Sequence, residues 1–447
     1  MRVAIKTLGC RQNQYESDAL EESLRGDGHT AVGPDEEADL FIINTCTVTK
    51  EADADSRQMI RRAIRRNRSA RVVVTGCYAQ VAAKEIASIP GVDLIVGNAE
   101  KTRLLELIRG LREKGPPLIA VSDIQRNRTF EPLPPPVRAS RSRAFLKVQD
   151  GCNFRCTFCI IPETRGPNRS QPQAAALRDL KALVDAGYPE VVLTGIHLGT
   201  YGRDLPIRSS ITGLVAEMLQ VAAPARIRLS SLDPHEVKED LIGCFARFGN
   251  LCRHLHLPLQ SGDDRVLKMM RRAYRADDFR RLVERLAEVV PGIAVGTDVI
   301  VGFPGEGEAE FENTYRLLER LPVAYLHVFS YSQRDGTVAA SLPDQVPKAV
   351  RAARSFALRS LSEKKWHEFR CAQVGQPLTA VVLDRRDVRT GRLEALTDNY
   401  VTVVLDAGEG YVGRVVGLTI EAVTERETLG RLLTHGPGVA LASGLAG

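Results

Sequence analysis

The first part of the chain alternates short apolar runs with amphipathic stretches. The apolar runs predict β-strands, and the stretches with apolar residues every three to four positions predict helices. The strands are expected at residues 2–7, 39–43, 71–75 and 94–96, and the helices at residues 16–25 and 53–66. Strands that alternate with helices favour an open, mostly parallel sheet, so residues 1–115 are expected to form an α/β domain.

The pattern changes three more times along the chain. Prolines make residues 116–140 an expected stiff linker, and from 141 to 371 the alternation resumes in six strand–helix steps. Six steps predict a partial (β/α)6 barrel, whose chemistry gathers at the C-terminal ends of the strands. Short strands separated by turns predict a small antiparallel β-barrel at 373–434, and 435–447 is expected to be a flexible tail.

Composition narrows the class of protein. Apolar residues make up 44% and charged residues 26% of 447 residues, as in ordinary globular proteins. Neither a signal-peptide pattern nor an apolar run of about 18 residues is present, so no membrane association and a cytoplasmic location are expected. The net charge of +6 permits an anionic partner without requiring one. In such a compartment the nine cysteines are expected to be reduced and available for metal binding or reaction.

Three of the cysteines form a compact C-x3-C-x2-C motif, Cys152, Cys156 and Cys159. The motif directly follows the first strand of the predicted barrel, which places the thiols at the C-terminal ends of the strands, where the chemistry of such barrels gathers. A loop this short can wrap an iron–sulfur cubane, and three thiolates leave one iron open for chemistry. The alternative, a structural zinc site, would need a fourth local cysteine or histidine, and the loop offers neither.

Three other cysteines are far apart in the sequence but follow strands in the same way. Cys10, Cys46 and Cys77 each lie just beyond the C-terminal end of a predicted strand of the first domain. Those ends share one edge of a parallel sheet, so the thiols are expected to converge on a second metal site. The alternative is three small buried structural cysteines.

The compact motif, together with the six-step barrel, resembles the radical S-adenosylmethionine (SAM) superfamily. The segments around Cys10, Cys46 and Cys77, the radical domain and a C-terminal RNA-binding barrel of the TRAM type resemble the methylthiotransferases in the same order. The resemblance implies a radical-generating [4Fe-4S] cluster on Cys152, Cys156 and Cys159, and an auxiliary sulfur-carrying [4Fe-4S] cluster on Cys10, Cys46 and Cys77. It also implies that SAM is contacted by residues at three strand ends, namely Thr194, Gly195, Ser230, Ser231, Gly302 and Phe303.

The stretches at 8–17, 228–234 and 254–262 most resemble the branch that methylthiolates C2 of N6-threonylcarbamoyladenosine at tRNA position 37, beside the anticodon. The alternative within the family is N6-isopentenyladenosine. The alternative from another class is a non-catalytic iron–sulfur or zinc RNA-binding protein, which would not cleave SAM. The resemblance further implies an electron donor such as flavodoxin or ferredoxin, and it does not identify the sulfur donor.

Basic residues offer two candidate tRNA contacts, which consist of Arg61, Arg62, Arg65 and Arg66 in the first domain and Arg271 and Arg272 in the second. The alternative for the first group is an ordinary solvated helix face. From residue 371 onward the chain has seven basic and nine acidic residues, an unusual balance for an RNA-binding barrel.

The other cysteines and two histidines are less informative. Cys244, Cys252 and Cys371 are expected to be structural thiols. His254 and His256 alternate on one strand and so share a face, where packing is favoured over substrate contact.

Overall fold

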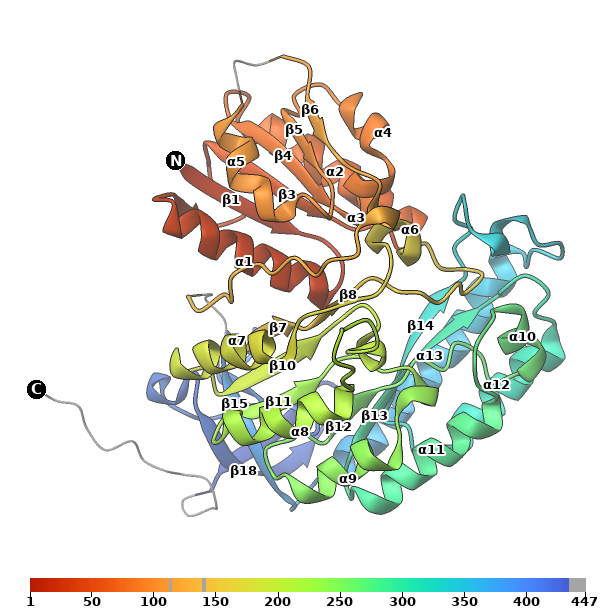
Figure 1. Cartoon of the computed structure of the whole chain (residues 1–447). Helices are drawn as coiled ribbons and strands as arrows, with labels where there is room; N and C mark the ends of the chain where they lie inside the picture. The colour runs from red at the N-terminus through yellow and green to blue at the C-terminus, as the bar shows by residue number, and fades with distance from the viewer. Residues whose placement is uncertain (112–114, 139–141, 434–447) are drawn as a thin grey trace, which may run out of the picture.

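The computed structural model describes residues 1–111, 115–138 and 142–433 (Figure 1). The N-terminal sheet lies above a larger barrel-like core, and the C-terminal strands lie behind and below that core. The predicted tail at 435–447 lies outside the described residues. This arrangement of a parallel α/β sheet, a partial (β/α) barrel and a closed β-barrel confirms the predicted fold class.

The N-terminal domain contains a six-stranded parallel sheet in the order β2-β1-β3-β4-β5-β6. Helices α1 and α5 cover one face, and α2, α3 and α4 cover the other. Its strands are β1 (Arg2–Thr7), β2 (Thr30–Val32), β3 (Leu40–Thr45), β4 (Arg71–Gly76), β5 (Leu94–Val96) and β6 (Leu118–Ala120). Its helices are α1 (Arg11–Gly26), α2 (Lys50–Arg66), α3 (Cys77–Val81), α4 (Ala83–Ala87) and α5 (Leu104–Arg109).

The stretch expected to be a linker contributes to this sheet. Within residues 116–140, β6 pairs with β5 as the edge strand, and a 3-10 turn follows at Ile124–Arg126. The boundaries at 115 and 140 stay predictions. The strand is short and directly follows Gly115, Pro116 and Pro117, which explains why the sequence pattern predicts a linker here.

The core contains six parallel strands in two linked sheets, β11-β10-β7 and β12-β13-β14, joined by isolated bridges between β11 and the β12 segment. The strands are β7 (Ala144–Lys147), β10 (Glu190–Thr194), β11 (Arg226–Leu229), β12 (His254–His256), β13 (Ala294–Val301) and β14 (Tyr325–Ser330). A short antiparallel pair, β8 (Gln149–Asp150) and β9 (Arg169–Ser170), lies beside the first strand.

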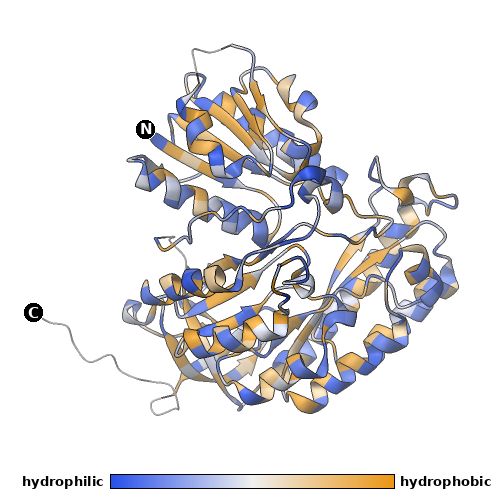
Figure 2. Cartoon of the chain, in the orientation of Figure 1, coloured by the Kyte–Doolittle hydropathy of each residue, from blue (hydrophilic) through white to orange (hydrophobic). Residues whose placement is uncertain are grey.

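Helices cover the outside of the core strands, and Figure 2 shows their apolar residues on the side that faces the strands. They are α7 (Gln173–Asp185), α8 (Ile211–Ala222), α9 (Glu239–Arg247), α10 (Asp264–Met269), α11 (Ala276–Val289), α12 (Glu308–Arg320) and α13 (Lys348–Cys371). The short helix α6 (Ile161–Arg165) instead packs against α3 and the 3-10 turn at Ile124–Arg126. Within the described residues, no helix combines the length and the apolar character that a membrane span requires.

The C-terminal strands close into a five-stranded barrel in the order β15-β16-β17-β19-β18 around an apolar core. They are β15 (Pro377–Arg386), β16 (Leu393–Thr397), β17 (Thr402–Leu405), β18 (Val415–Val423) and β19 (Thr428–Leu432). The turn after β16 packs against the core, where Arg228 donates to the carbonyls of Thr397 and Asp398, each at 2.9 Å.

The interaction of Arg228 with the barrel is anchored by Glu190 of β10, which is fully buried. Its carboxylate accepts from Arg228 at 2.8 and 3.0 Å and from Arg226 at 2.5 Å. Burial alone would raise the pKa of Glu190, but Arg228 and Arg226 hold that pKa well below its ordinary value. Because the pKa of Glu190 is lower in the folded than in the unfolded protein, its ionised form stabilises the fold. This stabilisation is fully present above about pH 4.3, the ordinary pKa of glutamate, and is lost as the pH falls through the lower pKa of the folded state.

Replacing Glu190 with Gln is expected to destabilise the core by about 3–5 kcal/mol, because two buried guanidinium groups lose their carboxylate. Chemical denaturation at pH 7, followed by far-UV circular dichroism, measures the effect. The control is Glu288→Gln, which removes an exposed pair with Arg285 at 3.0 Å and should cost at most about 1 kcal/mol. Equal losses for the two variants would refute the structural role of Glu190.

Candidate active site

The compact cysteine motif lies on the loop between β8 and α6 at the C-terminal end of the core strands. The loop begins at Gly151, whose φ of +72° belongs to the left-handed region that favours glycine. A Cβ at this position would lie 1.9 Å from the carbonyl oxygen of Pro167, so the close approach of the two segments requires glycine. The turn directs all three thiols toward the same end of the core.

Cys152 contacts a charged pair from the next two strands. Its Sγ lies 3.3 Å from Nδ1 of His197, which follows β10. Nε2 of that histidine lies 2.9 Å from a carboxylate oxygen of Glu236, in ion-pair range but without hydrogen-bond alignment. Burial lowers the pKa of His197, but hydrogen bonding to Cys152 and interaction with Glu236 outweigh it and raise the pKa to about 9. A positively charged imidazole therefore lies beside this sulfur.

Cys156 has a comparable partner in Arg272, whose Nη1 donates to its Sγ at 3.3 Å. The same guanidinium pairs with Asp233 and is largely buried. Arg271, the adjacent candidate for tRNA contact, is exposed instead. The structure thus places the two arginines in different environments, and only Arg271 lies on the surface. Burial raises the pKa of the third thiol, Cys159, to about 12, so metal binding there must displace a proton.

The dispersed cysteines lie at neighbouring strand ends of the N-terminal sheet. Cys10 follows β1, Cys46 follows β3 and Cys77 follows β4, and these three strands are adjacent in the sheet. A Cβ on Gly9 would lie 2.9 Å from Sγ of Cys46, which shows how closely the first two loops approach. The structure therefore brings the three segments together, as the strand ends predicted.

Neither triad has the geometry of a site for a single ion. Among the described residues, neither set of three sulfurs lies mutually within 4.8 Å. A tetrahedral zinc ion, with Zn–S bonds of about 2.3 Å, would hold its sulfurs about 3.8 Å apart. A cubane holds its thiolate ligands farther apart than one ion does, so the donors present fit iron–sulfur clusters better than zinc.

A cavity of about 200 Å³ is lined by residues of both the core and the N-terminal domain. Its lining includes Cys159 from the compact motif and Val48 and Thr49, which follow Cys46 closely in sequence. Apolar side chains form most of the remaining wall, namely Phe158, Ile160, Ile161, Ile300, Phe329 and Tyr331. The cavity is large enough for one flat heterocycle, and its lining joins a thiol of the compact motif, Cys159, to the segment that follows Cys46.

The polar side of this cavity contains Asp298, which accepts from Nε2 of His256 at 2.8 Å and from Nδ1 of His327 at 3.2 Å. His254, two residues earlier on the same strand, instead bonds to Tyr325 at 2.8 Å and stacks on Tyr400. The two histidines therefore differ, because His256 reaches the residue that lines the cavity and His254 packs against the C-terminal barrel.

The residues expected to contact SAM occupy three strand ends of the core. Thr194 ends β10, and the hydroxyl of Ser230 after β11 is buried without a hydrogen-bond partner among the described residues. Ser231 is exposed, whereas Phe303 is fully buried against Tyr331. The orphaned hydroxyl of Ser230 fits a ligand that supplies a polar group there.

The two glycines of that set mark close approaches of the chain. A Cβ on Gly195 would lie 2.8 Å from Oε1 of Gln149, and one on Gly302 would lie 2.1 Å from Cγ of Arg351. Both positions require a small residue for packing within the protein. Their contact with SAM, like that of the other members of the set, stays a prediction.

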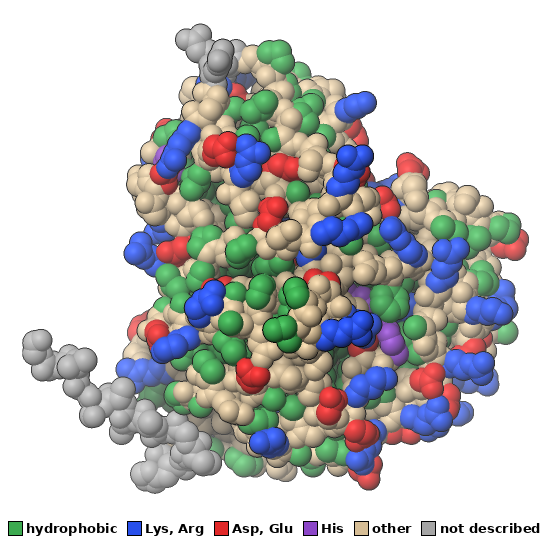
Figure 3. All heavy atoms as spheres, viewed as in Figure 1, with side chains coloured by type: hydrophobic (Ala, Val, Ile, Leu, Met, Phe, Trp, Pro, Cys, Tyr) green, Lys and Arg blue, Asp and Glu red, His purple; other side chains and the backbone are tan. Residues whose placement is uncertain are grey.

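The arginines expected to bind tRNA lie on the second half of α2. Arg61, Arg62 and Arg65 are exposed, while Arg62 and Arg66 pair with Asp35 at 3.2 and 3.4 Å. Lys and Arg side chains are spread over the face of both the N-terminal domain and the core that Figure 3 shows.

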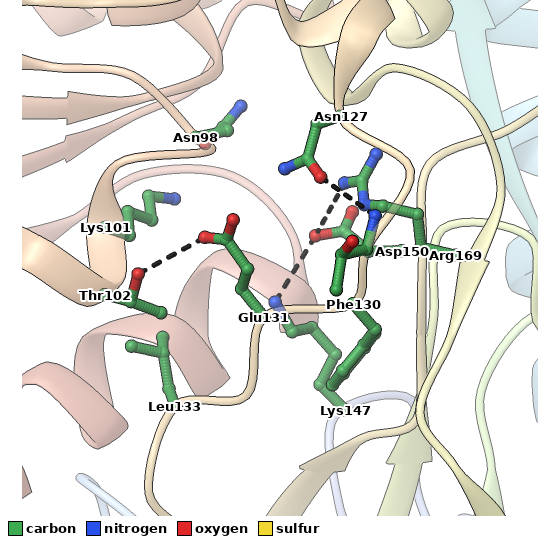
Figure 4. Close-up of a pocket in the computed structure, with 11 residues that line it drawn as sticks. Asn98, Lys101, Thr102, Asn127, Phe130, Glu131, Leu133, Lys147, Asp150 and Arg169 are labelled. Carbon is green, nitrogen blue, oxygen red and sulfur yellow. Dashed lines mark hydrogen bonds and ion pairs between the residues drawn. The ribbon is translucent and has the colours of Figure 1, made fainter.

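Sequence patterns did not reveal a group of buried charged residues between the N-terminal domain and the core. This interdomain charge cluster consists of Glu16, Lys101, Lys147, Asp150, Arg165 and Arg169. It borders a pocket of about 20 Å³, where Lys147 points toward Asp150 and Glu131 reaches Thr102 (Figure 4). Charged residues at these spacings match no metal or nucleotide motif, so sequence offered no signal for them.

Two family models match the chain. The model described as "Uncharacterized protein family UPF0004" matches residues 2–97, and the model of the radical SAM superfamily matches residues 146–318. A likeness to the solved structure of the radical SAM methyltransferase TsrM from Kitasatospora setae covers 73% of this chain and 72% of that chain, with a TM-score of 0.52. At 16% identity, that likeness shows a shared fold alone.

Curated relatives are much more similar. A threonylcarbamoyladenosine tRNA methylthiotransferase of Bacillus subtilis is 41% identical over 94% of this chain and 93% of its own length. The enzyme of the same name from Aquifex aeolicus is 38% identical over 94% and 100%. A tRNA-2-methylthio-N(6)-dimethylallyladenosine synthase of Syntrophotalea carbinolica is 32% identical over 95% and 98%. With Cys159 of the compact motif and the segment after Cys46 lining one cavity, and with this similarity along nearly its whole length, the chain belongs to the radical SAM methylthiotransferase family of enzymes.

Proposed function

We propose that this protein methylthiolates C2 of N6-threonylcarbamoyladenosine at position 37 of tRNA, next to the anticodon. The observation that carries the proposal is the cavity bordered by Cys159 on one side and by the segment after Cys46 on the other. A base held there would lie beside Cys159 and beside the segment that follows Cys46, and in this proposal its C–H bond is broken and its C–S bond is formed there.

In this proposal Cys152, Cys156 and Cys159 hold a [4Fe-4S] cluster with SAM, and Cys10, Cys46 and Cys77 hold the auxiliary [4Fe-4S] cluster. When bound, these groups supply the one-electron chemistry, the sulfur and the methyl group that an unreactive adenine C2–H bond requires. The protein supplies donors to two of the thiolate sulfurs, from His197 to Cys152 and from Arg272 to Cys156. Such donors favour the thiolate form that a metal needs.

The walls of the cavity would bind the base and keep water away from it. Phe329 is 46% exposed on the core side, and Val48 is 51% exposed on the N-terminal side. An exposed aromatic ring at the mouth of a cavity is suited to stack on a base that has left its own stack. Water exclusion protects a reactive intermediate from side reactions.

The substrate branch rests on the similarity of the relatives. Identity is 41% and 38% to the two threonylcarbamoyladenosine enzymes and 32% to the dimethylallyladenosine enzyme. The isopentenyladenosine substrate is therefore the second candidate. We place the reaction in the cytoplasm with a flavodoxin or ferredoxin as electron donor, while the sulfur donor is open.

The tRNA would approach along α2, which begins beside the cavity. Thr49 lines the cavity and caps the N-terminus of this helix by accepting from the backbone of Ala52 at 3.1 Å. Arg61 lies about 18 Å from Thr49 along the helix axis, at about 1.5 Å per residue. A tRNA with one base in the cavity would extend its phosphate backbone over such distances, so the exposed arginines are suited to contact it.

Anaerobic reconstitution tests the two-cluster assignment. We expect about eight irons per chain, and about four in the triple variant with Cys152, Cys156 and Cys159 replaced by Ala, because each triad holds one cluster. Iron and zinc are measured by mass spectrometry, and the triple variant should form no 5′-deoxyadenosine from SAM with a reductant. A single zinc per chain, or no 5′-deoxyadenosine from the wild-type protein, would exclude the enzyme proposed here.

Nucleoside mass spectrometry tests the substrate. A strain that lacks this gene should accumulate threonylcarbamoyladenosine without its 2-methylthio group, and a plasmid-borne copy should restore that group. Persistent 2-methylthio-threonylcarbamoyladenosine in the deletion strain would refute the substrate. Loss of the 2-methylthio group from isopentenyladenosine instead would favour the second candidate.

Salt titration tests the role of α2. Replacing Arg61, Arg62 and Arg65 with Ala should weaken tRNA binding and make the slope of log affinity against log salt shallower, by about one unit for each phosphate that the variant no longer neutralises. Filter binding at several salt concentrations measures both effects. The control replaces Arg280 and Arg281 of α11, which are also exposed and paired with carboxylates. Equal slopes for both variants would exclude α2 from the tRNA interface.

A further inference from the structure

One arginine of the core reaches into the N-terminal domain beside the dispersed cysteines. Arg165 ends α6, six residues after the last cysteine of the compact motif, and its side chain is fully buried. Its Nε donates to Sγ of Cys77 at 3.3 Å. A side chain from the radical core therefore contacts a cysteine of the other triad directly.

The same guanidinium reaches the other two cysteine loops through Asn13. Nη2 of Arg165 donates to Oδ1 of Asn13 at 2.5 Å. The side-chain amide of Asn13 donates in turn to the carbonyl of Leu8 at 2.7 Å and to that of Thr45 at 3.0 Å. Leu8 lies two residues before Cys10, and Thr45 lies one residue before Cys46. One arginine is thus tied to all three segments that carry the dispersed cysteines.

Charge gives a second, independent reason to connect Arg165 with an anion. The interdomain charge cluster contains four cationic side chains and two carboxylates, Glu16 and Asp150, and every member is buried. Arg165 pairs with Glu16 and lies 3.6 Å from Asp150, which itself also faces Lys147 at 3.3 Å. Buried cations without matching anions cost several kcal/mol each, so a surplus of positive charge here calls for a further negative group nearby.

We infer that Arg165 is a positioning residue for the auxiliary cluster. This side chain belongs to the core and donates a hydrogen bond to the Cys77 sulfur of the N-terminal domain. The inference rests on the proposed role of Cys77 as a cluster ligand. A thiolate-bound cluster supplies the missing negative charge, and the hydrogen bond holds the ligand in place. Hydrogen bonds to cluster sulfurs also set the reduction potential.

The test uses full-length protein in which Cys152, Cys156 and Cys159 are replaced by Ala, so that the auxiliary cluster is the one iron centre expected. Into this parent we introduce Arg165→Gln and, separately, Arg165→Lys. The Gln variant should lose iron to a chelator about tenfold faster than the parent, as is usual when a residue supporting a ligand is removed. Its reduction potential should be more negative, because a donor to sulfur is removed.

The Lys variant keeps the charge and one donor, so it should recover part of both properties and guards against a mere failure to fold. The matched control is Arg169→Gln. Arg169 is buried in the same charge cluster, forms an ion pair with Asp150 at 3.6 Å and donates to the carbonyl of Pro167, and none of its described contacts is to a cysteine. It should lower thermal stability without changing the potential or the electron paramagnetic resonance spectrum of the cluster.

Unchanged potential and iron loss in Arg165→Gln, with the same fall in thermal stability as Arg169→Gln, would overturn the inference. Equal shifts of the potential in both variants would overturn it as well, because charge alone would then explain them. A parent that binds no cluster would refute the role of Cys77 itself, and that result is visible before any Arg165 variant is made.

Discussion

The contact between the carboxyl ends of two parallel sheets determines how this molecule works. Parallel strands expose their loops at one edge, and here the loops of the N-terminal sheet face those of the core across a cavity of about 200 Å³. Buried ion pairs from Glu16 of the N-terminal domain to Arg165 and Lys147 of the core hold the two edges together. Without that contact, the cavity would lose the part of its wall that Val48 and Thr49 form.

The contact between the two domains also includes buried polar side chains that bond to the cysteine sulfurs. Donors reach Cys152 and Cys156 from within the core, through His197 and Arg272. Cys77 instead receives its donor from the opposite domain, through Arg165. In the proposed assignment, the auxiliary site is therefore completed only when the core is docked against the N-terminal domain.

The acidic balance of the C-terminal barrel also has a structural explanation. Its arginines are paired with its own carboxylates, Arg385 with Glu394 and Arg389 with Glu427, while Asp398 pairs with Arg253 of the core at 2.6 Å. Tyr400, at a positive φ of 73°, stacks on His254 with ring centroids 4.1 Å apart. Part of the barrel's charge and one of its aromatic rings therefore serve to dock it onto the core, so its composition is a poor measure of its affinity for RNA.

Sequence patterns predicted the six strands of the core and the gathering of Cys10, Cys46 and Cys77, because apolar periodicity and strand order determine both. They did not reveal β2 or β6, since both are short and lie beside glycine and proline residues that are typical of turns and linkers. Arg272 looked like a surface residue because it follows Arg271, and only tertiary packing turns it toward Cys156. Arg165 gave no signal at all, since its partners are as much as 152 residues away.

The most direct test of a base held between the two triads is an isotope measurement on the substrate. A tRNA with deuterium at C2 of the threonylcarbamoyladenosine would be incubated with reconstituted enzyme, SAM and reductant, and both products would be analysed by mass spectrometry. If the cavity holds the base as proposed, deuterium appears in 5′-deoxyadenosine in proportion to the methylthio group gained at the same carbon. Methylthiolated tRNA accompanied by 5′-deoxyadenosine without deuterium would contradict this arrangement of the site.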